Sequence, residues 1–532
     1  MIGYLNPTQV VLQPPENRIL GRYARKVRSR SIRRIMSQNL NDLFSGIDCL
    51  DVRGALDRSV TSIVIDSRRA TPGCLFFALP GMRSDGRFFI DEAIDRGARA
   101  IVFAQSRQFT PSDVTAIQVS RPRVVLAEVA RRFFHAPDEV LNVIGVTGTN
   151  GKTTVTYLVK HLLEGRGSRI GLLGTINYDL GARTVPAFRT TPESVDVYGM
   201  LAQMLTAGCR DVAMEVSSHG INQERVRGLK LKTAAFLNLT RDHLDYHGSM
   251  EDYFQVKARL FTGEAGSLPE VAVVNIDDPF GRRLVSMIPD GVQVVTFGLA
   301  DDADLRGSDL ELGYDSTDFT LHWGDGPVRV RSPLLGNYNL SNVLAALAIC
   351  HAAGTEITSV LPRLAGFAGI PGRMERVGKD CGFNVLVDYA HTDDALRNAL
   401  QMLRRITPGR LFVVFGCGGN RDRTKRPAMM KAVQEMADFA WATADNPRKE
   451  PLGSIFDDMR TGVGHPDRVQ FIEDRRHAIS LALDQARSGD CVLIAGKGHE
   501  SFQEFGDTIV PFDDRQVARE LIEIKRIKPN LS

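Results

Sequence analysis

Residues 142–154 decide the fold of this chain, and they read N-V-I-G-V-T-G-T-N-G-K-T-T. The β-branched run Val143–Val146 predicts a buried strand, and the apolar spacing from Tyr157 to Leu163 predicts a helix. The loop between them carries two glycines, followed by Lys152 and Thr153. Glycines let backbone N–H groups approach phosphate oxygens, a helix N-terminus adds partial positive charge, and a Lys-Thr pair can reach the outer phosphates and Mg²⁺. We therefore expect a loop that holds a triphosphate.

The loop departs from the strict pattern G-x-x-x-x-G-K-[ST], because Val146 stands where the first glycine belongs. A glycine-rich turn with a chance Lys-Thr pair is the alternative interpretation. The flanking strand and helix favour phosphate binding, since they are the structural context that the motif requires.

Length and composition predict a large globular protein of about three domains, at roughly 150 residues per domain. The 532 residues are 43% hydrophobic, and 66 basic against 63 acidic residues give a net charge of +3, which implies no bulk attraction to nucleic acid. The seven cysteines form no C-x-x-C pair, so we expect neither a disulfide framework nor a zinc site, and a cytoplasmic location. No apolar run is long enough for membrane insertion.

Residues 1–35 differ from the rest, since residues 18–34 hold eight Lys or Arg and no acid. This bias is typical of organellar transit peptides. The alternatives are a disordered basic extension or a start codon placed too early, since Met36 immediately precedes folded-looking sequence. We favour these plainer interpretations and expect a disordered N-terminal extension.

Three α/β segments follow, and we expect them to span residues 36–120, 121–370 and 371–532. The first combines short strands with one helix at 88–96. In the second, strands expected at 170–173, 212–216, 234–239 and 271–275 alternate with helices, which predicts a largely parallel sheet with ligands beyond the carboxyl ends of its strands. In the third we expect four strands, at 384–387, 411–415, 439–442 and 491–495.

Polar motifs follow the expected strands. Glu215 lies in the apolar run A-M-E-V, where a lone carboxylate is costly to bury without a positive partner, so we expect Glu215 and His243 to ligate Mg²⁺ directly or through another group. Asn339 and Asn342 open an apolar helix and could reach a nucleotide. In the third segment D-Y-A-H-T, G-C-G-G-N-R-D, A-D-N-P-R and G-K-G-H-E follow the four strands and are expected to build one site. Arg421 at the third glycine position argues against dinucleotide binding.

Six motifs in order make the sequence resemble the Mur ligases, the ATP-dependent amide ligases of peptidoglycan synthesis. They are T-G-T-N-G-K-T-T, E-V-S-S-H-G, N-L-T-R-D-H-L-D-Y-H-G, G-N-Y-N-L-S-N, P-G-R-M-E and D-Y-A-H-T, and the resemblance covers essentially everything from Asn39 onward. It implies a monomeric enzyme of cell wall biogenesis, with roles in cell shape, cell division and the cell cycle. The implied fold has a small α/β UDP-binding domain, a central phosphate-loop ATPase-like domain with a parallel sheet, and a C-terminal Rossmann-like α/β domain.

The resemblance also implies the residues of each site. Mg²⁺ would lie near Thr153, Glu215 and His243, and Lys152 with a carbamylated Lys257 would complete the catalytic set. ATP would be bound by Thr147, Gly148, Thr149, Asn150, Gly151, Lys152, Thr153, Thr154, Asn339, Asn342, Arg373 and Asp388. The UDP-sugar peptide would be bound by Ile65, Ser67, Met82, Arg83, Ser84, Thr190, Thr191, Ser217, Gln223, Arg225 and Lys257. Diaminopimelate would be bound by Arg421, Asp445, Asn446, Pro447, Arg448, Gly496 and Glu500, because D-N-P-R looks like the family's diaminopimelate signature.

The implied reaction joins meso-2,6-diaminopimelate to the D-glutamyl γ-carboxylate of UDP-N-acetylmuramoyl-L-alanyl-D-glutamate. ATP first converts that carboxylate to an acyl phosphate, which the amine of diaminopimelate then attacks. The expected partners are these two substrates, with neither nucleic acid nor a membrane. Arg189 stands where some relatives carry asparagine before Thr-Thr, so one substrate contact departs from the family pattern.

Several alternatives stay open at this point. They are a member of the same family that adds L-lysine, a folylpolyglutamate synthase, a non-catalytic homologue, and a generic phosphate-loop kinase or ATPase. The UDP-binding segment and D-N-P-R disfavour the synthase, and the four C-terminal motifs disfavour the generic kinase. Intact Lys152, Glu215, His243 and Lys257 disfavour the non-catalytic homologue.

Overall fold

The computed structural model describes residues 37–81, 85–104, 113–313, 316–324, 326–378 and 381–527. The chain divides into two compact units: Met1–Pro137 with Ser194–Gly208, and Asp138–Glu193 with Cys209–Ser532. The basic extension expected at residues 1–35 lies outside the described residues. Among the helices that are described, none is both long and apolar enough to cross a bilayer.

The first unit is built on a five-stranded sheet in the order β2-β7-β6-β5-β4. Its strands are β2 (Asp51–Arg53), β4 (Ser62–Val64), β5 (Cys74–Phe77), β6 (Ala100–Phe103) and β7 (Thr115–Gln118), and only β2 runs antiparallel to its neighbour. Every residue of β5 and β6 is buried, which is why both read as continuous apolar runs. Its α-helices are α3 (Leu40–Phe44), α4 (Ile90–Asp95), α5 (Pro122–Phe133) and α7 (Ser194–Thr206). The helix expected at 88–96 is shorter, because a 3₁₀ turn at Gly86–Phe89 precedes it.

The second unit holds an eleven-stranded sheet in the order β11-β10-β9-β12-β8-β13-β14-β15-β16-β17-β18. The strands β9, β12, β8, β13, β14, β15 and β16 are parallel. They are β8 (Asn142–Thr147), β9 (Arg169–Leu173), β12 (Cys209–Glu215), β13 (Thr233–Phe236), β14 (Val271–Asn275), β15 (Gln293–Gly298) and β16 (Leu305–Leu312). Because β8 lies between β12 and β13, the carboxyl ends of three adjacent strands meet where the phosphate loop begins.

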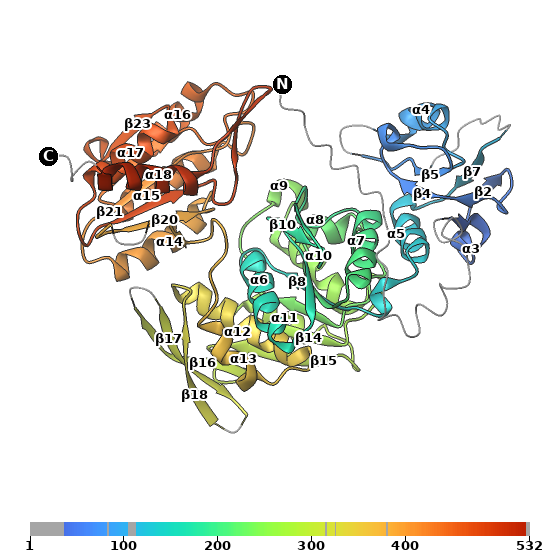
Figure 1. Ribbon diagram of the computed structural model, residues 1–532, viewed down its shortest axis with the longest axis horizontal. Helices are drawn as coiled ribbons and strands as arrows, with labels where there is room; N and C mark the ends of the chain where they lie inside the picture. Colours follow the sequence, from blue (N-terminus) through green and yellow to red (C-terminus); the bar gives the residue numbers. More distant parts are fainter. Residues whose placement is uncertain are drawn as a thin grey trace. The chain divides into compact units, whose positions relative to one another are not determined.

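Helices and an antiparallel ribbon complete this sheet. The helices are α6 (Lys152–Leu163), α8 (Ser218–Asn222), α9 (Leu244–His247), α10 (Met250–Thr262), α11 (Pro279–Val285), α12 (Asn337–Ala352) and α13 (Ile357–Leu364). The central helix α12 packs against α6, β14 and β15, so all of its residues from 343 to 350 are apolar and buried. The antiparallel strands are β10 (Asn177–Asp179), β11 (Thr184–Pro186), β17 (Thr317–Trp323) and β18 (Gly326–Ser332). The ribbon β16–β18, which was not expected from the sequence, is drawn in yellow-green in Figure 1.

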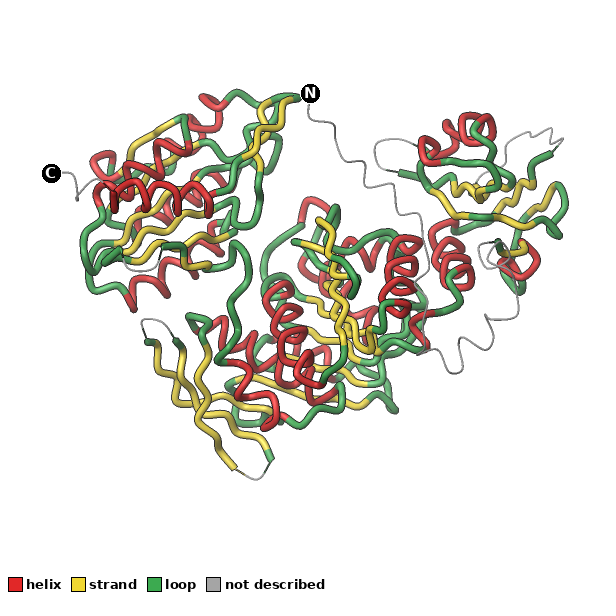
Figure 2. Tube along the Cα trace, viewed as in Figure 1, coloured by secondary structure: helices red, strands yellow, loops and turns green. Residues whose placement is uncertain are grey.

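The C-terminal part of the second unit is a six-stranded sheet in the order β19-β20-β24-β21-β22-β23. Its strands are β19 (Glu375–Arg376), β20 (Asn384–Asp388), β21 (Leu411–Phe415), β22 (Phe439–Thr443), β23 (Val469–Ile472) and β24 (Cys491–Ala495), and a hairpin of β25 (Phe502–Phe505) and β26 (Thr508–Pro511) follows. Alternate residues of β21 enter two cores. One core contains α14 (Asp393–Ile406), α15 (Lys425–Met436) and α16 (Leu452–Arg460), and the other contains α17 (Arg475–Gln485) and α18 (Asp514–Ile527). Figure 2 shows red helices packed along the yellow strands of this sheet.

The predicted α/β class, with parallel central and C-terminal sheets, is confirmed. The four strands expected in the third segment are present, but β19 and β23 extend their sheet to six strands. The strand expected at 234–239 ends at Phe236, which leaves Asn238 in the loop beside residues 149 and 150. The segment boundaries near residues 120 and 370 stay a prediction.

Candidate active site

The phosphate loop joins β8 to α6, with Gly151 at the N-cap in the left-handed region (φ 86°). A Cβ at Gly151 would lie 2.3 Å from Asn342 Oδ1, so this position requires glycine for space as well as for conformation. Lys152 Nζ donates to the carbonyls of Gly148 (3.0 Å) and Thr149 (2.9 Å). Burial lowers the pKa of Lys152, and the nearby carboxylate of Glu215 acts in the opposite direction.

The loop that follows β13 is hydrogen-bonded to the phosphate loop. Asn238 Oδ1 accepts from the backbone N–H of Thr149 (3.1 Å) and of Asn150 (2.9 Å), and Asn150 Nδ2 donates to Thr240 Oγ1 (3.3 Å). These two loop amides are therefore already hydrogen-bonded. The N–H groups of the first turn of α6 have no partner within the helix and can face an anion.

Glu215 ends β12 and is 1% exposed. Its Oε1 accepts from Thr153 Oγ1 (2.9 Å) and from the backbone N–H of Thr175 (2.8 Å), and its Oε2 accepts from Thr175 Oγ1 (2.9 Å). A Cβ at Gly174 would lie 2.5 Å from Oε1. Within the described ranges this buried carboxylate forms no ion pair, although a buried charge without a counter-charge is costly. Its surroundings therefore fit a bound cation.

The residues expected around the peptide of the nucleotide substrate form one hydrogen-bonded network that starts at Glu215. Thr191 Oγ1 donates to the carbonyl of Glu215 (2.9 Å) and accepts from the N–H of Ser217 (2.9 Å). Arg225 donates to the Thr191 carbonyl (2.9 Å) and to Gln223 Oε1 (2.7 Å).

The same network takes in Thr190 and Glu193. The hydroxyls of Thr175 and Thr190 are 3.1 Å apart. Glu193 Oε1 lies 3.1 Å from Arg225 Nε and 2.6 Å from an amino nitrogen of Arg189. The residue that departs from the family pattern is therefore paired with an acid of this network.

His243 belongs to a group of rings on α8, α9 and α10. Its backbone is left-handed (φ 53°), its Nε2 lies 3.5 Å from Asp242 Oδ2, and its ring centroid lies 4.9 Å from that of His219. Among the described residues, no three His, Cys, Asp or Glu side chains form a ready metal cluster. A Mg²⁺ site shared by Thr153, Glu215 and His243 stays a prediction.

Lys257 lies on α10 and is 1% exposed. Its Nζ donates to the Gly148 carbonyl (3.0 Å), lies 3.5 Å from Thr147 Oγ1, and is 4.6 Å from the centre of the Tyr253 ring. Burial lowers the pKa of Lys257 well below its ordinary value, and the neighbouring charge of Lys152 lowers it further. This environment favours a neutral amine.

The remaining residues expected at ATP lie on α12 and near the start of the C-terminal sheet. Asn339 donates to the Leu335 carbonyl (2.8 Å) and Asn342 donates to Asn339 Oδ1 (2.9 Å), so both form hydrogen bonds inside the protein one turn into α12. Arg373 lies over the Tyr389 ring at 4.5 Å, and its buried Nε has no hydrogen-bond partner among the described residues.

Asp388 is held by the C-terminal sheet itself. It accepts from the N–H groups of Met374 (2.7 Å) and Ala390 (2.8 Å). Burial raises the pKa of Asp388, and Arg373 opposes that shift.

At the carboxyl edge of the C-terminal sheet, Asn446, Glu500 and Lys497 form a triangle of contacts. Asn446 Nδ2 donates to Glu500 Oε2 (2.8 Å), and Lys497 Nζ donates to the same oxygen (3.0 Å) and to Asn446 Oδ1 (3.1 Å). Lys497 is fully buried. A Cβ at Gly496 (φ 112°) would lie 2.7 Å from Asp445 Oδ2. The second oxygen of Glu500 is the one that this triangle leaves for a ligand.

Arg448 lies beside this triangle in a left-handed conformation (φ 54°). Its Nε lies 3.2 Å from Glu504 Oε2, and its guanidinium donates to the Gly419 carbonyl (3.0 Å). A Cβ at Gly419 would lie 1.8 Å from the Pro447 carbonyl oxygen, so the strand-end loops pack backbone against backbone. Arg421 is exposed on the same loop as Gly419. The hairpin β25–β26, which carries Glu504, thus holds the arginine of D-N-P-R.

The first unit contains the residues expected to bind UDP. Ser67 is buried and donates to Glu92 Oε2 at 2.7 Å, and Ile65 is partly exposed just after β4. Met82, Arg83 and Ser84 lie outside the described residues.

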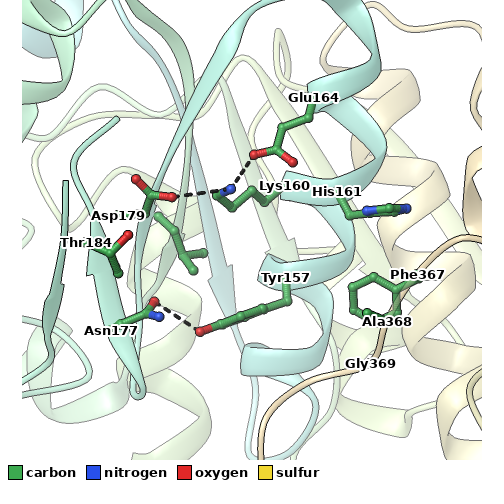
Figure 3. A pocket seen from close by; sticks show the side chains of 11 residues that line it. Tyr157, Lys160, His161, Glu164, Asn177, Asp179, Thr184, Phe367, Ala368 and Gly369 are labelled. Atoms are coloured by element: carbon green, nitrogen blue, oxygen red, sulfur yellow. Dashed lines mark hydrogen bonds and ion pairs between the residues drawn. The ribbon is translucent and has the colours of Figure 1, made fainter. Parts of the chain in front are cut away.

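The second unit also contains a hollow of about 250 Å³, whose lining includes Leu172, Thr184 and Phe367. None of the candidate site residues described above lines this hollow. In it, Lys160 pairs with Glu164 and lies 3.3 Å from Asp179, and Tyr157 donates to Asn177 at 3.0 Å (Figure 3). Because these charged and polar groups pair with one another, we assign no ligand to this hollow.

Sequence reasoning missed four residues that organise the site, namely Thr175, Tyr253, Lys497 and Glu504. Lys497 lies within the quoted motif G-K-G-H-E, so its position offered a signal. The other three carry no local signal, because each acts on a partner that is distant in sequence.

The sequence matches three domain models of one protein family. These are the Mur ligase family, catalytic domain (residues 59–134), the Mur ligase middle domain (146–350) and the Mur ligase, glutamate ligase domain (372–498). A UDP-N-acetylmuramoyl-L-alanyl-D-glutamate–2,6-diaminopimelate ligase of Solibacter usitatus is 45% identical over 467 residues, covering 87% of this chain and 94% of the relative. A protein of the same name from Gloeobacter violaceus is 43% identical over 480 residues, covering 90% and 96%.

Solved structures agree with these relatives. A structure of a ligase with that same name has a TM-score of 0.67 at 33% identity and covers 92% of this chain and 100% of its own. A folylpolyglutamate synthase of Mycobacterium tuberculosis, at 20% identity and a TM-score of 0.58, covers 70% of this chain and 92% of its own, and shares the fold alone.

Proposed function

Because the chain belongs to the Mur ligase family, we propose that it joins diaminopimelate to the D-glutamyl γ-carboxylate of UDP-N-acetylmuramoyl-L-alanyl-D-glutamate. The chain is an ATP-dependent, amide-bond-forming ligase of peptidoglycan synthesis. The observation that carries the assignment of the reacting centre is Glu215, a buried carboxylate that forms no ion pair with any described residue and is hydrogen-bonded to Thr153 of the phosphate loop.

Thr153 and Glu215 are the side chains that would hold Mg²⁺, because a hydroxyl and a carboxylate are oxygen ligands that this ion prefers. His243 is proposed as a further contact. Mg²⁺ bound there would neutralise charge on the outer phosphates of ATP. Lys152 and the first-turn amides of α6 would hold the γ-phosphoryl group while its bond to the leaving ADP lengthens.

Lys257 is proposed to carry a carbamate. Its neutral amine would form an N–C bond to CO₂ and release one proton, which places a carboxylate on a four-carbon arm. The support is a buried amine that forms no ion pair in the described part of the chain and is held 3.0 Å from the Gly148 carbonyl. A negative charge there would also offset the positive charge of Lys152, which now opposes a charged Lys257.

With ATP and the peptide bound by these groups, the reaction has two steps. The D-glutamyl γ-carboxylate attacks the γ-phosphorus of ATP, and ADP leaves. The amine of diaminopimelate attacks the carbonyl carbon of the acyl phosphate, loses a proton, and the tetrahedral intermediate expels phosphate. The network of Thr191, Ser217 and Arg225 would orient the peptide, since it starts at the Glu215 backbone and its hydroxyl and guanidinium groups can form hydrogen bonds. Ile65, Ser67 and residues 82–84 stay proposed contacts of the UDP group.

The amino acid would enter at the C-terminal sheet. Glu500 suits an ammonium group through the oxygen that Lys497 and Asn446 leave unbonded. Arg448 and Arg421 suit the carboxylates of diaminopimelate, because a planar guanidinium can give a carboxylate two hydrogen bonds.

Phosphate release from ATP tests this proposal. Purified protein is supplied with diaminopimelate and either UDP-N-acetylmuramoyl-dipeptide or a folate with glutamate. We expect release that requires both the UDP-muramoyl substrate and diaminopimelate. Release with the folate pair instead, or release that needs no amino acid, would contradict the proposal.

A further inference from the structure

We infer that Tyr253 is a positioning residue that ties the phosphate loop to the Lys257 arm, an inference that rests on the proposed function. Tyr253 lies on α10 with 1% exposure. Its hydroxyl is 3.3 Å from Thr149 Oγ1, and its ring centre is 4.6 Å from Lys257 Nζ. One side chain therefore contacts two elements of the reacting centre that are more than a hundred residues apart in sequence.

The hydrogen bonds of Thr149 assign a direction to the hydroxyl contact. Thr149 Oγ1 donates to the Thr240 carbonyl (3.3 Å) and accepts from the Thr240 N–H (3.0 Å). Its remaining lone pair can accept from the Tyr253 O–H, which has Ser218 as a second side-chain partner. Burial raises the pKa of Tyr253 to about 12, so the phenol keeps the proton that it donates. The tyrosine thereby completes the bonding of a loop residue whose backbone N–H is held by Asn238.

The ring of Tyr253 positions the Lys257 side chain. The two residues are four apart on α10, so their side chains lie on one face of the helix. The ring is itself held, because it stacks on His247 at 4.8 Å with an interplanar angle of 23°, and His247 Nε2 lies 2.9 Å from Ser218 Oγ. Packing against this fixed ring holds the long, flexible Lys257 side chain in a defined position.

The two contacts can be separated by substitution. Tyr253→Phe keeps the ring and removes the hydroxyl, whereas Tyr253→Leu removes both. Phe254→Leu is the matched control, since Phe254 is equally buried on the same helix but packs on Phe280 (5.2 Å) instead.

The measurements are the dissociation constant of a non-hydrolysable ATP analogue, kcat, and the bicarbonate concentration that gives half-maximal rate. For Tyr253→Phe we expect analogue binding about fivefold weaker with kcat nearly unchanged, because the neutral hydrogen bond to the phosphate-loop residue Thr149 is lost. For Tyr253→Leu we expect the same binding loss, kcat lower by on the order of tenfold, and a higher bicarbonate requirement, since the ring contact is lost as well. Phe254→Leu should lower only the thermal midpoint.

Unchanged analogue binding in Tyr253→Phe would overturn the inference, and this variant stays informative if Tyr253→Leu fails to fold. The inference would also be overturned if Tyr253→Leu and Phe254→Leu had the same kcat and the same bicarbonate requirement. A wild-type protein that binds no ATP analogue would refute the proposed function itself, and this inference with it.

Discussion

Replacing Arg448 with alanine tests how the protein selects its amino acid. Diaminopimelate differs from lysine by one carboxylate at its far end, so a site that selects it needs a cation there. Arg448 is the candidate, and the structure adds that Glu504 already lies 3.2 Å from its Nε. One amino nitrogen of Arg448 donates to the Gly419 carbonyl. The other N–H groups on the two amino nitrogens of Arg448 can then bind a substrate carboxylate.

The expected loss of kcat/KM in Arg448→Ala depends on how far the Arg448 side chain is buried. Losing one partner of a buried charged hydrogen bond costs about 2–5 kcal/mol. The Arg448 side chain is 23% exposed and Glu504 is 35% exposed, so solvent screens the pair and the lower part of that range applies. About 2–3 kcal/mol corresponds to a fall in kcat/KM for diaminopimelate of roughly 30- to 150-fold. Lysine lacks the carboxylate at the far end that Arg448 would bind, so its kcat/KM should change by less than about threefold.

The assay is amino-acid-dependent phosphate release, with kcat/KM measured for diaminopimelate and lysine in each protein. Lys449→Ala is the matched control, because the neighbouring Lys449 is 73% exposed and pairs with the exposed Asp507 at 3.1 Å. It should leave both values unchanged. A wild type that prefers lysine, an equal loss on both amino acids in Arg448→Ala, or the same loss in Lys449→Ala would refute the reasoning.

Three further predictions concern the reacting centre. Lys152→Ala should lower ADP release by on the order of 100-fold or more without changing the thermal midpoint, and wild-type turnover would contradict the phosphate-loop assignment. Glu215→Gln keeps the shape but removes the charge, so the Mg²⁺ concentration for half-maximal rate should rise by about tenfold or more, and an unchanged titration would exclude Glu215 as a ligand. Lys257→Met should be inactive yet more stable in CO₂-free buffer. Because the pKa of Lys257 is lower in the folded than in the unfolded state, wild-type stability should rise with pH between those two values, and denaturation of the variant should lack that slope.

The local sequence was sufficient to predict the elements of the fold and the motifs at their ends. Strand β14 and the strands β21 and β24 have the bounds that were expected, because a buried parallel strand must be a short continuous apolar run. The phosphate loop was predictable for a related reason. Its strand, glycines, Lys-Thr pair and helix are consecutive, so their spacing alone defines the loop.

Antiparallel edges were harder to predict. In the strands β16, β17 and β18 the buried residues are interrupted by partly or fully exposed ones, several of them charged, so the strands lack a continuous apolar signal. Strand β13 was expected to be longer than it is, because Leu237 and Leu239 are buried beyond its end. Burial by tertiary packing and membership of a strand cannot be separated from an apolar pattern alone.

The sequence by itself determined which residue types stand at the ends of the strands, since those follow directly from local patterns. Only the tertiary structure decided which of them meet. The order that places β8 between β12 and β13 brings Thr153 to Glu215, and the hairpin β25–β26 brings Glu504 to Arg448. These contacts depend on which strands pair and on how side chains fill the space between them. Such pairings are set by the summed burial of the whole domain, so no window of local sequence contains them.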